Sequence, residues 1–89
     1  MGPQAFEIAT LEQQGPRKWL AGGRAYTDIS LDDRLTTPRG GSDSLRVVGI
    51  VSYGRSTDLL STMMTGTLTL EGELQVGADH PMFLHTLGN

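Results

Sequence analysis

The residues with the clearest capacity for chemistry are two histidines, His80 and His85, and the aspartate beside the first of them, Asp79. An imidazole held by a carboxylate can act as a general base or bind a metal ion. One hypothesis is therefore a small hydrolase or metal-dependent enzyme that uses His80 and His85 with an aspartate. Their spacing of five residues, however, fits neither a helical metal site at i, i+4 nor one strand face at i, i+2. A turn beginning at Asp79 is the simpler interpretation, and we predict no catalytic residue, no metal and no cofactor.

The acidic residues offer a second kind of chemistry. Asp28, Asp32 and Asp33 could bring oxygen ligands toward a cation such as calcium, but the glycine and distal glutamate of an EF-hand are missing. Turn stabilisation through hydrogen bonds from side chain to backbone is the favoured explanation. Glu71 and Glu73 share a strand face, and an exposed strand end explains them without acid–base catalysis. No Gly-x-Ser-x-Gly sequence is present, and the absence of cysteine excludes disulfides, thiolate metal sites and a thiol nucleophile.

Positive charge and aromatic rings occur together at several points, beginning with Arg17, Lys18 and Trp19. RNA-binding barrels use arginine to contact phosphates and aromatic rings to stack on bases. We predict a partner-binding set that includes the glycine-rich loop around Arg39: Trp19, Arg24, Arg39, Tyr53 and Arg55. The alternative is that the rings belong to the core or its rim and the arginines keep the surface soluble. A net charge of −3 argues against broad affinity for nucleic acids.

An apolar cluster suggests a third possibility, a structural subunit that associates with itself as a homodimer. The cluster consists of Leu59, Leu60, Met63 and Met64. Adaptable methionine-rich surfaces bind partners when they are exposed. Filling of the core is the favoured interpretation in a domain this small.

The elements that must position these residues are short strands. Twelve glycines and four prolines interrupt a chain of 89 residues at short intervals, which is typical of β proteins and contradicts a helical bundle. The apolar patterns predict strands over 5–11, 18–26, 28–35, 45–53 and 67–76. The glycine pair Gly22-Gly23 predicts a bulge, a bend or a close backbone approach within the second of them. About six short strands in one domain, 1–89, predict an all-β, small antiparallel β-barrel, with a sandwich as the alternative.

Several details of packing follow from the same patterns. Along 45–53 we expect a central strand that is apolar on both sides, with Leu45, Val47, Val51 and Tyr53 on one side and Val48 and Ile50 on the other. Along 28–35 we expect Ile29, Leu31 and Leu35 to face inward. The stretch 36–44 reads as a polar loop without packing residues, and 58–64 as a loop that plugs one barrel end or as a helical turn. The tail 79–89 should pack through three apolar residues, Phe83, Leu84 and Leu87.

Read in order, the chain resembles the second domain of translational GTPases of the elongation factor Tu type. Gly22 followed by Ile29, Leu31, Asp33 and Leu35 is similar to that family's glycine-marked strand and turn. The strand 47–50 and the segment 64–72, Met-Thr-Gly-Thr-Leu-Thr-Leu-Glu-Gly, are similar to its middle strand and late segment. The resemblance covers about residues 5 to 72 and departs at the turn glycines, which are replaced by Thr27 or Asp28 and by Asp32.

The resemblance implies a translation-factor-like small antiparallel barrel that contacts RNA ends, ribosomal RNA or partner domains. The chain has neither a phosphate-binding glycine loop nor a guanine-specificity motif, so we expect no GTP binding by that route. It also has no apolar run that could span a bilayer and no secretory h-region near its first residue, so we expect a cytoplasmic protein without a membrane partner. The favoured function is a noncatalytic interaction module that binds a protein or a structured RNA.

Overall fold

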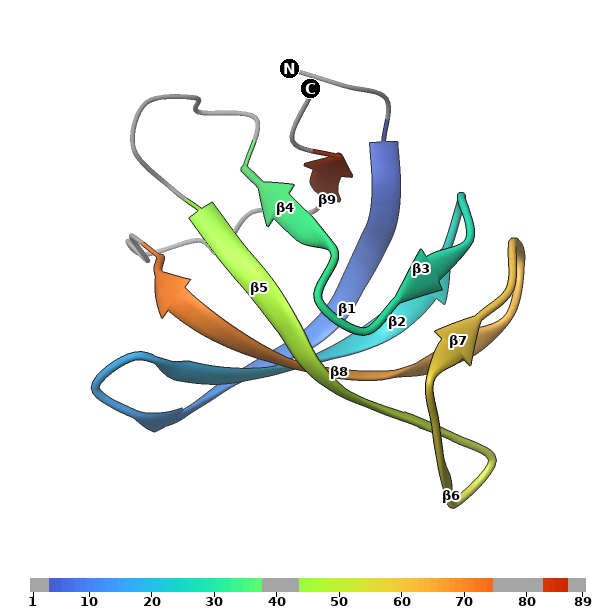
Figure 1. Ribbon diagram of the computed structural model, residues 1–89, viewed down its shortest axis with the longest axis horizontal. Coiled ribbons are helices and arrows are strands. Elements are labelled where there is room, and N and C mark those ends of the chain that lie inside the picture. Colours follow the sequence, from blue (N-terminus) through green and yellow to red (C-terminus); the bar gives the residue numbers. More distant parts are fainter. Residues whose placement is uncertain (1–3, 38–43, 75–82, 87–89) are drawn as a thin grey trace.

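A computed structural model describes residues 4–37, 44–74 and 83–86 of the chain. Within these ranges the chain forms nine β-strands: β1 Gln4–Gly15, β2 Lys18–Ala25, β3 Ile29–Ser30, β4 Arg34–Thr36, β5 Ser44–Ser52, β6 Arg55–Thr57, β7 Leu59–Leu60, β8 Thr65–Glu73 and β9 Phe83–Thr86 (Figure 1). The described residues contain no helix that is long and apolar enough to cross a membrane.

Six strands close into a barrel in the order β4-β9-β1-β2-β8-β5, and β5 pairs back onto β4. Every pairing in this ring is antiparallel. The strand β6 adds to the free side of β5, while β3 and β7 form a separate two-stranded sheet at one end of the barrel (Figure 1). The prediction of an all-β, small antiparallel barrel is confirmed. Closure leaves few unpaired strand edges, which protects a small β domain from edge-to-edge association.

The long strands bend through bulges. In β1 the register passes from the pair Ile8 and Gly23 to the pair Thr10 and Gly22, which leaves Ala9 without a partner. The bulge that Gly22-Gly23 predicts is therefore present, although the extra residue lies on the facing strand. In β5 the register similarly steps over Val48. Bulges of this kind increase the local twist and allow a short sheet to curl into a barrel.

The barrel interior holds one apolar core, and each fully buried leucine or isoleucine contributes about 1.5–3 kcal/mol relative to an exposed one. Leu84 of β9 is completely buried, so the predicted packing of the tail is confirmed at this residue. Leu87 lies outside the described residues. The core consists of Ala5, Phe6, Ile8, Trp19, Ala21, Ala25, Ile29, Leu35, Leu45, Val47, Ile50, Leu60, Leu68, Leu70, Leu74 and Leu84.

The predicted alternation of β5 is wrong beyond its middle. Leu45 and Val47 are fully buried as expected, but Val51 is 40% exposed and Tyr53 is 80% exposed. The bulge at Val48 inserts one residue into the strand, so the inward positions after it are Ile50 and Ser52 instead. A shift of one residue moves every later side chain to the other face.

Two loops also differ from expectation. Thr36 and Thr37 are buried, because β4 continues to Thr36 and its pairing with β5 and β9 closes the barrel; residues 38–43 of that predicted loop lie outside the described part. Leu31, expected to face inward, is 39% exposed in the turn that follows β3. The predicted loop over 58–64 contains no helical turn: Leu59–Leu60 form β7, a turn follows at 62–63, and Leu60 is fully buried in the core.

Candidate functional site

The structure separates the five predicted partner-binding residues. The Trp19 ring is buried in the core, and its Nε1 donates a hydrogen bond of 3.4 Å to the backbone oxygen of Gly72. Arg24, Tyr53 and Arg55 are exposed, whereas Arg39 lies outside the described residues. Trp19 is therefore placed where it stabilises the fold, and the accessible members of the set are Arg24, Tyr53 and Arg55.

Tyr53 and Arg55 belong to the tip of the β5–β6 hairpin. The pairing of Ser52 with Arg55 leaves a loop of two residues, Tyr53-Gly54, whose φ angles are 54° and 76°. Positive φ at both positions defines a type I′ turn, in which Asn-Gly and Gly-Gly are the preferred pairs. A tyrosine in this conformation is strained, since a bulky side chain crowds its own backbone there. The ring is 80% exposed, so burial does not offset that strain.

Apolar exposure is concentrated around this hairpin. Among the described residues, the exposed large apolar side chains all come from the turn after β3 or from 51–63; we call this surface the hairpin end, and it consists of Leu31, Val51, Tyr53, Leu59 and Met63. Backbone pairing holds their segments next to one another, because Val51 pairs with Ser56, Leu59 pairs with Ser30, and the Leu31 amide donates to the oxygen of Asp58. Exposed apolar side chains that cluster in this way mark interaction surfaces more often than isolated ones do.

The predicted self-association cluster is divided by the fold. Leu60 is fully buried and Met64 packs against the core, whereas Leu59 is 43% exposed and Met63 is 62% exposed. The favoured interpretation, core filling, holds for Leu60 and Met64, and the other two residues belong to the hairpin end.

Arg24 lies two strands away from the hairpin. It pairs with Thr65 of β8, whose backbone oxygen accepts a hydrogen bond of 2.9 Å from the Ser52 hydroxyl. At the usual strand spacing this places Arg24 about 10 Å from the start of the turn. Arg24 also lines an open groove of about 590 Å³ with Glu7 and Thr67. In the same region Tyr26 donates a hydrogen bond of 2.8 Å to Glu7, and this bond, together with partial burial, raises the pKa of the Tyr26 phenol.

Each of the three aspartates considered for a cation forms hydrogen bonds or an ion pair within the protein. The Asp28 carboxylate accepts hydrogen bonds of 2.8 Å from the amide and the hydroxyl of Thr62, and these bonds lower its pKa. Asp33 accepts a bond of 2.8 Å from the amide of Ser30, while Asp32 pairs with Arg46 at 3.3 Å. The predicted turn-stabilising bond from side chain to backbone is confirmed for Asp33, whereas Asp28 connects two segments that are 34 residues apart. No group of three potential metal ligands occurs within the described ranges.

The remaining candidates for chemistry are dispersed. Glu71 and Glu73 form ion pairs with Arg46 and Arg17, respectively. His85 lies on β9, opposite Gln4 of β1 and Thr36 of β4. His80 and Asp79 lie outside the described residues, so the enzyme hypothesis stays a prediction.

Sequence reasoning missed two members of the hairpin end, Leu31 and Val51. The strand alternation assigned both to the inside, because a bulge or a turn leaves only a weak trace in an apolar pattern. Glycine is the usual marker of such a bulge, and Gly49 directly follows the unpaired Val48.

Comparisons with known proteins give no match: no protein-family model, no curated protein and no solved structure is similar enough to the chain to assign it to a family. The resemblance to the second domain of elongation factor Tu therefore stays a prediction.

Proposed function

We propose that the protein is a noncatalytic interaction module that binds a protein or a structured RNA through its hairpin end. The observation that carries this proposal is Tyr53, a strained and 80% exposed aromatic residue at the tip of the β5–β6 hairpin. Strained residues without a packing role are frequent at functional sites. Tyrosine and arginine dominate the binding energy of many interfaces, and Arg55 adjoins the turn.

The translation-factor resemblance supports the same class of function. In that family the corresponding barrel contacts RNA ends, ribosomal RNA or partner domains. We propose such a role in the cytoplasm, without GTP. The apolar side chains around Tyr53 favour a protein partner, while Arg24 and Arg55 supply positive charge that an RNA would require.

The test uses the Tyr53→Asn variant, because asparagine suits a type I′ turn and removes the ring. We expect its free energy of unfolding to rise by about 0.5–1 kcal/mol, since turn strain is relieved. Affinity for the partner should fall at least about tenfold, as for a binding hot spot. Purification of complexes from the native lysate with and without ribonuclease, followed by mass spectrometry, identifies the partner and its class. The isolated partner is then titrated with both proteins.

The matched control is Glu12→Gln, at an exposed position of β1 remote from the turn, which should leave affinity unchanged. A partner that binds wild type and Tyr53→Asn equally contradicts the proposal. Release by ribonuclease would assign an RNA partner, and retention would assign a protein.

Self-association is a second candidate function, favoured by the exposure of Leu59 and Met63. It predicts a mass that falls on dilution in ultracentrifugation, and a monomer at all concentrations for Leu59→Ser. A wild-type protein that is monomeric throughout the same range contradicts this candidate.

A further inference from the structure

Four charged side chains form one row across the outer face of the barrel. Strand register places Lys18 of β2 opposite Glu71 of β8, Glu71 opposite Arg46 of β5, and Arg46 opposite Arg34 of β4. All four are exposed. The row contains three of the seven basic residues in a chain whose net charge is −3. It lies toward the Ser44 end of β5, about 20 Å along the strand from Tyr53.

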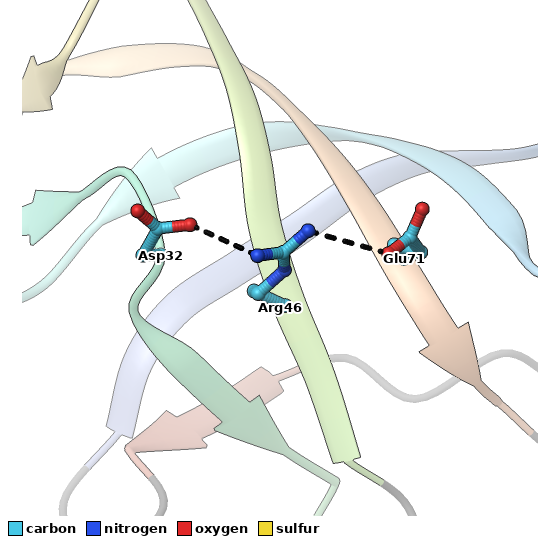
Figure 2. A network of polar contacts seen from close by, with 3 residues as sticks. All are labelled: Asp32, Arg46 and Glu71. Atoms are coloured by element: carbon cyan, nitrogen blue, oxygen red, sulfur yellow. Dashed lines mark hydrogen bonds and ion pairs between the residues drawn. The ribbon is translucent and has the colours of Figure 1, made fainter.

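The carboxylates along this row already have partners. Figure 2 shows Arg46 between Asp32 and Glu71, with nitrogen to oxygen distances of 3.3 Å and 3.5 Å. Beside it, Arg17 from the β1–β2 turn pairs with Glu73. These pairs hold the Arg17 and Arg46 side chains in place. Exposed ion pairs contribute little stability of their own, so orientation is their main effect.

Lys18 and Arg34 have no ion-pair partner among the described residues. Lys18 lies opposite the carboxylate Glu71, whereas Arg34 lies opposite another arginine, Arg46. Side chains directly opposite in an antiparallel pair have Cβ atoms about 5 Å apart, and like charges at that distance are destabilising. The two arginines also lie where the barrel closes, between β4 and β5, which share only two register pairs. Repulsion between them therefore destabilises the closure of the barrel.

A concave surface joins these guanidinium groups. We call it the charged groove; it encloses about 360 Å³ and is lined by Arg17, Arg34, Ser44, Arg46, Glu71, Gly72 and Glu73. The lining carries three guanidinium groups and two carboxylates, and Ser44 adds a hydroxyl donor. Asp32, which pairs with Arg46, balances the third guanidinium in number, but Arg34 forms an ion pair with none of the three carboxylates.

We propose that the charged groove binds a phosphate group that bridges Arg34 and Arg46. A guanidinium presents several N–H donors in a planar fork, and a tetrahedral phosphate has enough oxygens to accept from two such forks. The anion replaces the repulsion between the two arginines with two attractive contacts and fastens β4 to β5. Because the groove lies far from Tyr53, this proposal stands or falls independently of the hairpin end.

The experiment measures thermal unfolding of the full chain while phosphate replaces chloride at constant ionic strength. Phosphate is kept below about 10 mM, where general salting effects on burial are small. We expect the unfolding midpoint to rise by about 6–11 °C once phosphate reaches about ten times its dissociation constant.

Three variants assign the shift to the groove. Arg34→Gln should lose the response to phosphate and unfold no earlier than wild type in chloride, because the opposed charges are gone. Arg34→Glu should also lose the response and should unfold later than wild type in chloride, because Glu at this position opposes Arg46 with the opposite charge. Arg55→Gln, which removes one positive charge at the hairpin instead, should keep the full response.

Two results would overturn the proposal. One is a midpoint in wild type that does not depend on phosphate. The other is an equal shift in wild type, Arg34→Gln and Arg55→Gln, which indicates a general salt effect. Repeating the titration with phosphoserine and with a short oligouridylate identifies the source of the group: a larger Arg34-dependent shift with the first assigns a phosphomonoester, and with the second the backbone of RNA.

Discussion

At the Ser44 end of β5 the outer face of the barrel is charged, whereas at the Ser52 end it is apolar. The charged groove has its side chains tied across strands by ion pairs, and the hairpin end exposes side chains such as Val51 and Tyr53. The bulge at Val48 lies between the two. Because of this extra residue, Ile50 is buried in the core and Val51 is turned outward.

The strand β5 therefore contributes residues to two different surfaces. The first half of β5 alternates buried apolar residues with polar or charged ones, so one face packs in the core and the other faces solvent. The second half is apolar on both faces, and the side that does not enter the core becomes available to a partner. A single inserted residue therefore decides which apolar side chains stabilise the fold and which are left to bind.

The largest effect is expected from lysine on the two sides of the bulge. Val47 is fully buried, so Val47→Lys places an unpaired charge in the core and should cost about 4 kcal/mol or more, enough to unfold much of so small a domain. Val51→Lys should change the free energy of unfolding by less than about 0.5 kcal/mol, because the position is on the surface. Urea denaturation followed by circular dichroism measures both.

Regular alternation along β5 makes the opposite prediction, since it assigns both valines to one face. Equal destabilisation by the two substitutions would therefore show that the bulge does not separate the faces. Val48→Lys, at the half-buried bulge itself, should lie between them.

The features of β5 and its neighbours also differ in whether the sequence could predict them. Glycine spacing and apolar alternation were sufficient for the all-β barrel and for core residues such as Ile29 and Leu35, because both depend on local patterns. The exposed position of Val51 could not be derived, because it depends on a register step against β8. The opposition of Arg34 and Arg46 depends on barrel closure between strands that chain order alone does not pair. Trp19 was assigned to a binding surface by residue type, although its ring lies in the core.

The second largest effect is expected at the glycines of the two regions. Gly72, in the lining of the charged groove, has a φ of 145°, and a Cβ there would lie 2.2 Å from the backbone oxygen of Ser44. Gly72→Ala should therefore cost about 3 kcal/mol, because backbone must move in addition to the strain. Gly54 has a φ of 76° and open space around it, so Gly54→Ala should cost only about 1 kcal/mol.

Unfolding midpoints in urea give both values, provided that the slope of the transition is unchanged. The urea midpoint should be highest for wild type, lower for Gly54→Ala and lowest for Gly72→Ala. The reverse order would mean that the hairpin turn, and not the β5–β8 pairing beside the charged groove, is the tightly constrained region.

The smallest effect concerns acid. Hydrogen bonds from Thr62 lower the pKa of Asp28 in the folded protein, so the ionised carboxylate stabilises the fold at pH values above its unfolded pKa of about 4. This stabilisation is lost as the pH falls through the lower, folded pKa, because the protonated group accepts these bonds less well.

Thr62 precedes Met63, so protonation should loosen the hairpin end before the charged groove. Amide hydrogen exchange between about pH 3 and pH 6, corrected for intrinsic rates, should show earlier loss of protection at Thr62 than at Val47. In Asp28→Ala this acid-dependent difference should disappear, since the titrating group is absent. An unchanged difference in Asp28→Ala would assign it to another carboxylate and would remove the link between Asp28 and the hairpin end.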